Sequence, residues 1–144
     1  MKEELIWALA FDYPRLYIGT RRRYESASFQ GITCGDGWEP IVRWLSAAIE
    51  RLIEIEPKEE QEFYRCIEVR ERFGGIEFYM NDATEEMTKL VKIATSESFK
   101  VCEFCGQPGV LRQDGRRGAK TLCEACRGKV VVLPLASSTP VPHF

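Results

Sequence analysis

The stretch CEFCGQPGVLRQDGRRGAKTLCEAC, residues 102–126, holds four of the six cysteines in this 144-residue chain. They form two pairs, with two residues between the members of each pair: Cys102 and Cys105, then Cys123 and Cys126. Such a pair can place both sulfurs on one ion when the backbone between them turns tightly, and Gly106 permits the left-handed conformation that these turns often use. Two turns of this kind supply four thiolates, which predicts a closed, structural Zn²⁺ site of the zinc-ribbon type.

The segment between the two pairs also agrees with a zinc ribbon. The 17 residues between Cys105 and Cys123 match the usual spacing, and Asp114-Gly115 favours a hairpin that returns the chain to the first pair. The alternatives are an iron site of the rubredoxin type, and cysteines that are reduced or joined in disulfides. Because four thiolates leave no open coordination position, a catalytic metal is not expected. The segment has few apolar residues, so the metal must supply much of its folding free energy.

The composition of the whole chain is that of an ordinary soluble protein, with 44% hydrophobic and 29% charged residues. No run approaches the roughly 20 apolar residues of a membrane-spanning helix, and no signal peptide is recognised, so we expect a cytoplasmic protein without a membrane partner. Thiols stay reduced there, which favours metal binding over disulfides. The formal net charge of −2 does not indicate a polyanionic partner for the chain as a whole.

The first two thirds of the chain alternate between helix and strand patterns. A short amphipathic helix is predicted over residues 2–12. A longer helix is predicted from Trp38 to Ile53, where apolar residues recur at the three-and-four spacing of one buried face. Asp36 or Gly37 can cap its start.

Two segments with alternating apolar residues flank the glycines at 74 and 75, which predicts a β-hairpin that turns at that pair. The side chains expected on its inner face are Phe63, Ile67, Val69, Phe73, Ile76, Phe78 and Met80. A short strand is predicted near Ser28–Ile32, and a further helix is predicted over residues 81–99.

This order of elements predicts an α+β fold, in which helices flank a small antiparallel sheet and a zinc ribbon follows. The body is expected to span residues 1–99, the ribbon residues 100–130 and a C-terminal tail residues 131–144. An exposed apolar face on the first helix would allow a homo-oligomer, and the sequence leaves the oligomeric state open.

Two elements of the body are candidates for ligand binding. GDGW opens the long helix, where free N–H groups can bind an anion and Trp38 could stack on a base. RERFGG carries Arg70 and Arg72 on the outer face of a strand, and guanidinium groups bind phosphate. If both elements meet, they form a pocket for a nucleotide-like molecule, lined by Asp36, Gly37, Trp38, Arg70, Arg72, Gly74 and Gly75. The alternative is that Trp38 belongs to the core and that the arginines are solvated or paired with Glu68 or Glu71.

The ribbon loop RQDGRRGAK offers a different site. Its basic residues could contact the phosphates of a nucleic acid: Arg112, Arg116, Arg117 and Lys120. No aromatic residue lies among them, so stacking on single-stranded bases has little support. A solvated loop is the alternative.

Catalytic machinery is weakly indicated. Cys34 precedes a helix start, which would stabilise a thiolate, whereas Cys66 lies in a predicted strand and is expected to be packed. A thiol nucleophile also needs a base, and the sole histidine of the chain is His143, in the tail. Asp36 and Glu39 are too ordinary a pair to predict acid–base catalysis. The sequence therefore favours a protein that is not an enzyme.

Three motifs together resemble a family of small phage- and prophage-encoded proteins: CGDGW at 34–38, VRERFGGIEFY at 69–79, and CEFCGQPG at 102–109 followed by CEAC. In that family a CGDGW-like element, a hairpin and a C-terminal zinc ribbon occur in the same order. This chain differs by carrying Ile76-Glu77 where Leu-Arg is usual.

The resemblance implies a phage-encoded protein in the cytoplasm of a bacterial host, and it supplies no mechanism. Small accessory proteins of phages often act on host defences by binding. We therefore expect a non-enzymatic protein that binds, and so inhibits or sequesters, a host defence protein or a phosphorylated, nucleotide-derived signal. The alternative is a zinc ribbon that binds nucleic acid through its basic loop.

Overall fold

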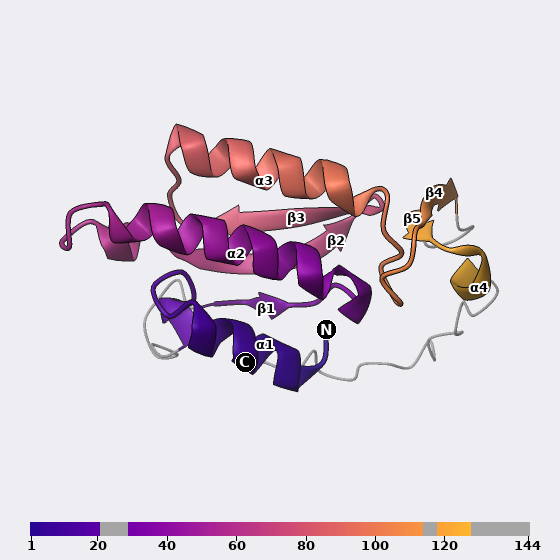
Figure 1. Ribbon diagram of the computed structural model, residues 1–144, viewed down its shortest axis with the longest axis horizontal. Coiled ribbons are helices and arrows are strands. Elements are labelled where there is room, and N and C mark those ends of the chain that lie inside the picture. Colours follow the sequence, from indigo (N-terminus) through magenta and orange to yellow (C-terminus); the bar gives the residue numbers. More distant parts are fainter. Residues whose placement is uncertain (21–28, 114–117, 128–144) are drawn as a thin grey trace.

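Helix α2 (Glu39–Glu54) is the longest described element and lies between the other two long helices, against one face of the sheet (Figure 1). Its fully buried apolar side chains recur every three or four residues, as the sequence predicted: Val42, Leu45, Ile49 and Ile53. Pro40 stands in its first turn, where the missing N–H costs no helical hydrogen bond. The structure, a computed structural model, describes residues 1–20, 29–113 and 118–127.

Two further helices flank α2. Helix α1 (Glu3–Asp12) buries Ile6 and Leu9, and helix α3 (Glu85–Ser98) buries Met87 and Ala94. Thr84 caps α3, because its side-chain oxygen accepts a 3.2 Å hydrogen bond from the backbone N–H of Met87. Three short 3₁₀ turns connect the described elements: η1 (Ile18–Thr20), η2 (Asp36–Trp38) and η3 (Gln61–Phe63).

The main sheet has three strands in the order β1 (Gly31–Ile32), β2 (Cys66–Arg72) and β3 (Gly75–Met80). Strands β2 and β3 are antiparallel, as predicted, but β1 runs parallel to β2, so the sheet is mixed. The reason is that α2 lies between β1 and β2 in the chain, and a crossover of that length can return the chain in the same direction. The predicted α+β class is confirmed.

The β2–β3 hairpin turns one residue earlier than predicted. Arg72 pairs with Gly75, so the loop consists of Phe73 and Gly74, whose φ angles are 51° and 88°. Two-residue hairpin loops with positive φ at both positions match the twist of the flanking strands. Phe73 therefore points away from the core and is 72% exposed, contrary to its predicted inward position.

The alternation predicted for the first strand also differs in part. A register shift between Cys66 and Glu68 makes Cys66 and Val69 the buried residues of β2, while Ile67 is only partly buried. Phe63 lies in η3 and is 52% exposed. In β3 the prediction holds, because Ile76 and Phe78 are buried and Met80 lies against the core.

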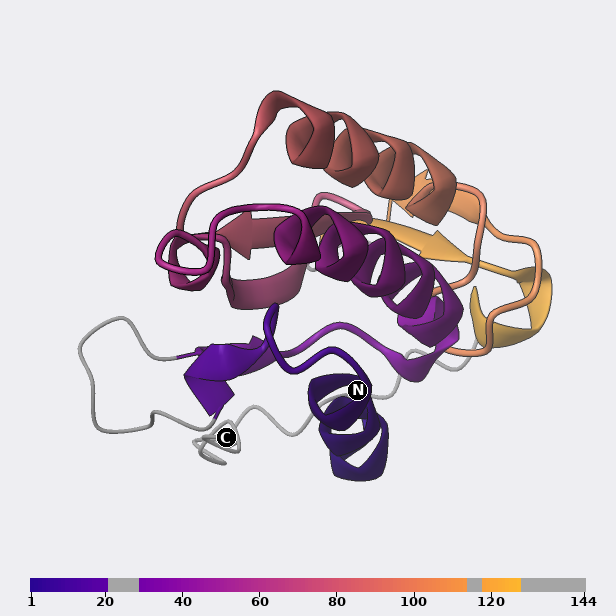
Figure 2. The ribbon, with the colours of Figure 1, turned by 60° about the vertical axis from the view of Figure 1, so that its left-hand side comes forward.

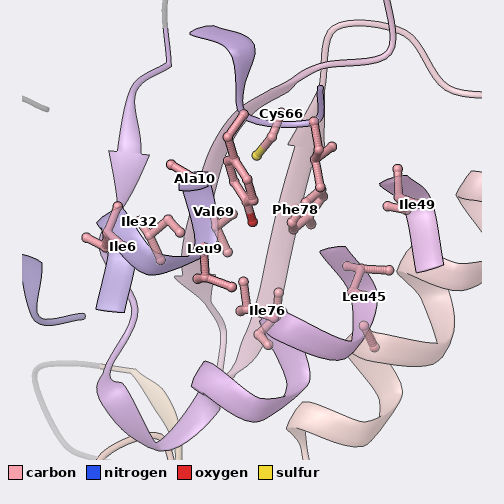
Figure 3. Packing of buried hydrophobic residues seen from close by; sticks show 14 of the residues in the cluster. Ile6, Leu9, Ala10, Ile32, Leu45, Ile49, Cys66, Val69, Ile76 and Phe78 are labelled. Atoms are coloured by element: carbon pink, nitrogen blue, oxygen red, sulfur yellow. The ribbon is translucent and has the colours of Figure 1, made fainter. Parts of the chain in front are cut away.

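The core lies between the sheet and the helices (Figure 3). Side chains from the helices and from all three strands point toward one another there, among them Leu9, Ile32, Leu45, Val69 and Ile76. Tyr17 is also buried, and its hydroxyl shares a 2.7 Å hydrogen bond with Ser46 Oγ, so its polar atom has a partner.

The ribbon is a separate two-stranded sheet at the hairpin end of the body (Figures 1 and 2). It consists of β4 (Val110–Gln113) and β5 (Ala119–Leu122), which are antiparallel, followed by α4 (Glu124–Arg127). The predicted tail lies outside the described residues. No helix in the described part of the chain has the length and apolar character to span a membrane.

Candidate metal centre

The four cysteine sulfurs of the ribbon converge on one point. All four lie within 4.8 Å of one another, and the sulfurs of Cys105 and Cys123 are 3.5 Å apart. Metal–sulfur bonds of about 2.3 Å in a tetrahedron put the sulfurs about 3.8 Å apart. The cluster can therefore hold one metal ion.

Each cysteine pair forms the tight turn that this arrangement requires. In the first pair, the backbone N–H of Gly106 donates to the carbonyl oxygen of Cys102 at 3.0 Å, and Gly106 has a φ of 78°. In the second pair, the backbone N–H of Cys126 donates to Cys123 Sγ at 3.3 Å. This hydrogen bond is the largest cause that lowers the pKa of the Cys123 thiol to about 7. A lowered pKa favours the thiolate, the form that binds metal.

The cluster is shielded unevenly. Cys102 is fully buried and Cys126 is buried, whereas Cys105 is exposed and Cys123 is half-buried. Four sulfur donors suit Zn²⁺ or iron, and they leave no coordination position for a substrate. The centre is therefore suited to holding structure rather than to catalysis.

The first cysteine turn lies directly on the GDGW element of the body. The backbone N–H of Gly37 donates to the carbonyl oxygen of Glu103 at 2.7 Å, and that of Gly35 donates to the carboxylate of Glu103 at 3.0 Å. The indole N–H of Trp38 donates to the carbonyl oxygen of Val101 at 2.8 Å. The N–H groups considered for binding an anion are thus bonded to the ribbon.

The glycines of GDGW leave no room for a side chain. A Cβ on Gly37 would lie 2.2 Å from the carbonyl oxygen of Cys102 and 2.5 Å from the nitrogen of Gly106. A Cβ on Gly35 would lie 2.5 Å from the carbonyl oxygen of Glu103. Backbone packs against backbone here, which explains why both positions are glycine.

Asp36 fixes the start of α1 instead of capping α2. Its carboxylate accepts a 2.7 Å hydrogen bond from the backbone N–H of Lys2 and lies 3.9 Å from Lys2 Nζ. No described side chain caps α2, which follows the η2 turn directly. The α-amino group of Met1 donates to the carbonyl oxygen of Cys34 nearby. The CGDGW element therefore joins the N-terminus, α2 and the ribbon.

The hairpin turn forms a second contact with the ribbon. The carbonyl oxygen of Gly74 accepts a 2.6 Å hydrogen bond from Thr121 Oγ1, which is buried. A Cβ on Gly74 would lie 2.3 Å from Leu111 Cδ1, and one on Gly75 would lie 2.5 Å from the ring of Phe99. Because Gly74 and Gly75 have no side chains, the ribbon and Phe99 pack directly against the backbone of the FGG motif.

A partly buried ion triad joins the same surfaces. Lys120 Nζ lies 3.0 Å from Glu71 on β2 and 3.3 Å from Glu103 in the first cysteine turn. Burial by itself would lower the pKa of Lys120, but the carboxylates of Glu103 and Glu71 outweigh it and raise that pKa. Glu103 is 4% exposed. The sequence did not predict that Glu103 joins the ribbon to the body, because the position of Glu103 belongs to no recognisable spacing pattern.

The seven residues predicted to line one ligand pocket lie in three places. Asp36, Gly37 and Trp38 lie at the first cysteine turn, and the Gly74-Gly75 pair lies beside β4 and Phe99. Arg70 and Arg72 lie in the third place, beside Glu77 of β3. Trp38 is fully buried, so its indole has no free face for stacking on a base. This placement agrees with the alternative interpretation of Trp38 as a core residue. A ligand-binding role for the set stays a prediction.

Arg70 and Arg72 lie on the outer face of the hairpin. Both guanidinium groups lie 3.4 Å from the same oxygen of Glu77 on β3, rather than beside Glu68 or Glu71 as considered from the sequence. Arg70 also lies over the ring of Tyr79 at 5.0 Å, and Arg72 over the ring of Phe73 at 5.2 Å. These arginines are partly exposed and partly neutralised.

The basic residues proposed for nucleic-acid binding are divided. Lys120 belongs to the ion triad, and Arg112 pairs with Glu124 at 2.9 Å while donating to the carbonyl oxygen of Leu122. Arg116 and Arg117 lie outside the described residues. Two of the four side chains are therefore already bonded within the protein, which weakens the nucleic-acid alternative.

The two remaining cysteines are poorly suited to attack a substrate. Both are buried, and burial raises the pKa of Cys34 to about 12 and raises that of Cys66 as well. His143 lies outside the described residues. The predicted packing of Cys66 is confirmed.

The cysteine cluster and the two glycine contacts thus form one continuous region that joins the ribbon to the body. No protein-family model, curated protein or solved structure matches this chain.

Proposed function

We propose that this chain is a non-enzymatic binding protein in which a structural Zn²⁺ ion holds the ribbon in place on an α+β body. The observation that carries the proposal is the cluster of four sulfurs within 4.8 Å, one turn of which is bonded to the body through Glu103. Zinc would be held by Cys102, Cys105, Cys123 and Cys126. Bound there, it would supply a rigid cross-link and no open position for chemistry.

The described side chains support a role other than catalysis. Cys34 is buried with a raised pKa, and Asp36 is occupied by the backbone of Lys2. Glu50 is buried, and it accepts hydrogen bonds from the backbone N–H groups of Arg15 and Leu16. Each of these groups has a structural task.

The partner that we propose is a host defence component, and the producer a phage acting in a bacterial cytoplasm. The resemblance of the three motifs to phage-encoded proteins supports this assignment. Of the two partner classes, the geometry favours a protein over a nucleotide-derived signal. The N–H groups of Gly35 and Gly37 are bonded to Glu103, and Trp38 is buried, so the elements considered for phosphate and base are occupied.

Elemental analysis of the purified protein tests the metal assignment. We expect one zinc per chain, no iron and no visible absorption of an iron–thiolate centre. Metal-free protein with the same thermal stability as zinc-loaded protein would reject a structural zinc site.

Calorimetry of zinc-loaded protein against phosphorylated signalling nucleotides tests the choice of partner class. We expect no heat of binding. Saturable heat that is abolished by Arg70→Ala and Arg72→Ala, but not by Arg65→Ala, would show that the partner is a nucleotide after all. Arg65 is a suitable control because it donates only to the carbonyl oxygen of Glu62 among its recorded hydrogen bonds.

A further inference from the structure

Strand β3 is an edge of the main sheet, because β2 is its only strand neighbour among the described residues. Near the turn, the main-chain N–H and C=O groups of β3 that point away from β2 form hydrogen bonds with side chains of α3. The N–H of Ile76 donates to Ser98 Oγ, and its carbonyl oxygen accepts from Thr95 Oγ1, both at 2.9 Å. Outward-facing residues recur every second position in an antiparallel pair, so the main-chain groups of Phe78 and Met80 point the same way.

The outward N–H and C=O groups of Phe78 and Met80 form no hydrogen bond with any described residue. A free edge of this kind is a template for another strand, and proteins usually protect it with lysine, proline or a cover. The strand reads GIEFYM, which has neither lysine nor proline and is rich in residues that favour strands.

A groove runs along this edge. It has a volume of about 370 Å³, and α3 contributes one wall through Val91, Thr95 and Phe99. The other wall consists of β3 itself, with Phe78 and Tyr79 along its length. Thr95 and Ser98 reach the edge backbone at Ile76, so α3 closes the edge near the turn, whereas farther along β3 it forms one wall of the groove. The groove is thus a shallow, open surface along β3, beside which one extended chain can lie.

Charged side chains lie at the end of the groove near the turn. Arg72 and Glu77 both line it, and the side chain of Arg72 is 52% exposed. Arg70 and Arg72 share a single carboxylate, that of Glu77, through contacts of 3.4 Å. One guanidinium charge at this end is therefore not neutralised by Glu77, and a carboxylate on a bound chain would complement it.

We propose that the free edge of β3 binds an extended, acidic segment of a partner protein as an added strand. This inference rests on the proposed binding function and names the surface and the kind of partner. The segment would exchange main-chain hydrogen bonds with Phe78 and Met80. Its alternate side chains would lie against Val91 and Phe99, and those between them would face the solvent beside Tyr79, with an acidic residue near Arg72.

A lone strand fits this groove better than a second copy of the chain. Two copies paired edge to edge through β3 would bring their α3 helices together, because α3 lies along the β3 side of the sheet in both views (Figures 1 and 2). The main-chain groups of Ile76 are already bonded to α3, so with respect to the described residues the free part of the edge is Phe78–Met80. A short segment without its own helix would not clash with α3, and it needs no more of the edge than the Phe78–Met80 part.

The probe for this surface is a displayed library of random peptides, each about ten residues long, the upper range of natural strands. Selection is made on full-length, zinc-loaded protein. We expect enrichment of sequences with alternating apolar residues and at least one Asp or Glu. In the complex, amide hydrogen exchange should slow at Phe78 and Met80.

Two pairs of variants test the contacts. Met80→Pro removes an outward N–H and should weaken binding about tenfold, the loss typical of one hydrogen bond, while Met80→Leu should bind as the parent does. Arg72→Glu should weaken binding of acidic peptides, whereas Lys92→Glu, the same charge change at an exposed position of α3, should not. Unchanged hydrogen exchange in the core identifies variants that remain folded.

Three outcomes would overturn the inference: no enrichment on folded, zinc-loaded protein; enriched peptides that protect amides elsewhere; or concentration-dependent dimers that protect Phe78 and Met80 without any peptide. Because metal content and folding are measured separately on the same sample, a failure here is distinct from a failure of the zinc-stabilised fold.

Discussion

The backbone N–H of Gly37, at the start of η2, donates a 2.7 Å hydrogen bond to the carbonyl oxygen of Glu103, in the first cysteine turn. A residue between the first two cysteines of the cluster is thereby bonded to the element that opens the central helix. The cysteine cluster therefore contacts the body as well as closing the ribbon. Its position on the body depends on close backbone packing at Gly37.

Gly37→Ala should destabilise the protein strongly. Its Cβ would lie 2.2 Å from the carbonyl oxygen of Cys102, a backbone atom that cannot move without moving the cysteine turn. We expect a loss of about 3 kcal/mol in the free energy of unfolding, at the upper end for an overpacked site, measured by urea denaturation with excess zinc.

The matched control for that experiment is Gly118→Ala. Among the described residues, nothing lies within 4 Å of a Cβ on Gly118, and its φ of 74° is what disfavours alanine there, so we expect a loss of about 1 kcal/mol. Equal losses at the two positions would contradict the packing argument.

Lys120→Met should destabilise more than an exposed lysine substitution. It leaves Glu71 and Glu103 without their shared cation, and we expect a loss of about 2 kcal/mol, less than for a fully buried pair because the lysine side chain is 17% exposed. Lys89→Met, which breaks an exposed pair with Glu85, should cost less than about 0.5 kcal/mol.

The same triad predicts a dependence of stability on pH. The pKa of Lys120 is raised in the folded protein, so its stabilising contribution is complete below the ordinary lysine pKa of 10.5. That contribution is lost as the pH rises through the raised value. The stability difference between the parent and Lys120→Met should therefore shrink in strongly alkaline solution, and a difference that grows there would contradict the assignment.

Removal of the metal should expose Trp38. Its indole is fully buried and bonded to Val101, directly before the first cysteine, so loosening of the ribbon should shift its fluorescence to longer wavelength. Trp7→Phe with Trp44→Phe, both at exposed positions, isolates this signal. A chelator that removes zinc without changing the emission would show that the metal does not hold the ribbon against the body.

Without metal, Cys123 should be the first thiol to be alkylated at neutral pH. Its pKa of about 7 makes roughly half of it thiolate there, and it is only half-buried. Cys34, which is buried and has a pKa of about 12, should react only after unfolding. Mass spectrometry of protein treated with iodoacetamide distinguishes the sites, and early labelling of Cys34 would contradict the structure.

Phe73→Asn should stabilise the protein by about 0.5–1 kcal/mol. Phe73 holds a φ of 51° in a two-residue hairpin loop, a conformation that asparagine adopts more readily than phenylalanine, and its side chain is 72% exposed. Phe63→Asn, at another exposed phenylalanine, should give no such gain in thermal denaturation.

Much of the local structure follows from short-range patterns. The stripe along α2, the alternation of β3 and the two cysteine pairs were all predictable, because a few neighbouring residues fix helix and strand periodicity and the geometry of a cysteine turn. The turn residues were misplaced by one position. A phenylalanine with positive φ is unfavourable locally and is maintained by the pairing of Arg72 with Gly75.

The sequence alone determined the α+β class, the core face of the central helix and the four sulfurs that can share an ion, since each depends on residues close together in the chain. Only the tertiary structure decided what the glycine motifs do. Gly35 meets Glu103 across 68 residues of sequence, and Gly74 meets Thr121 across 47. No local sequence pattern predicts these contacts, because they depend on how elements that are distant in the sequence pack against one another.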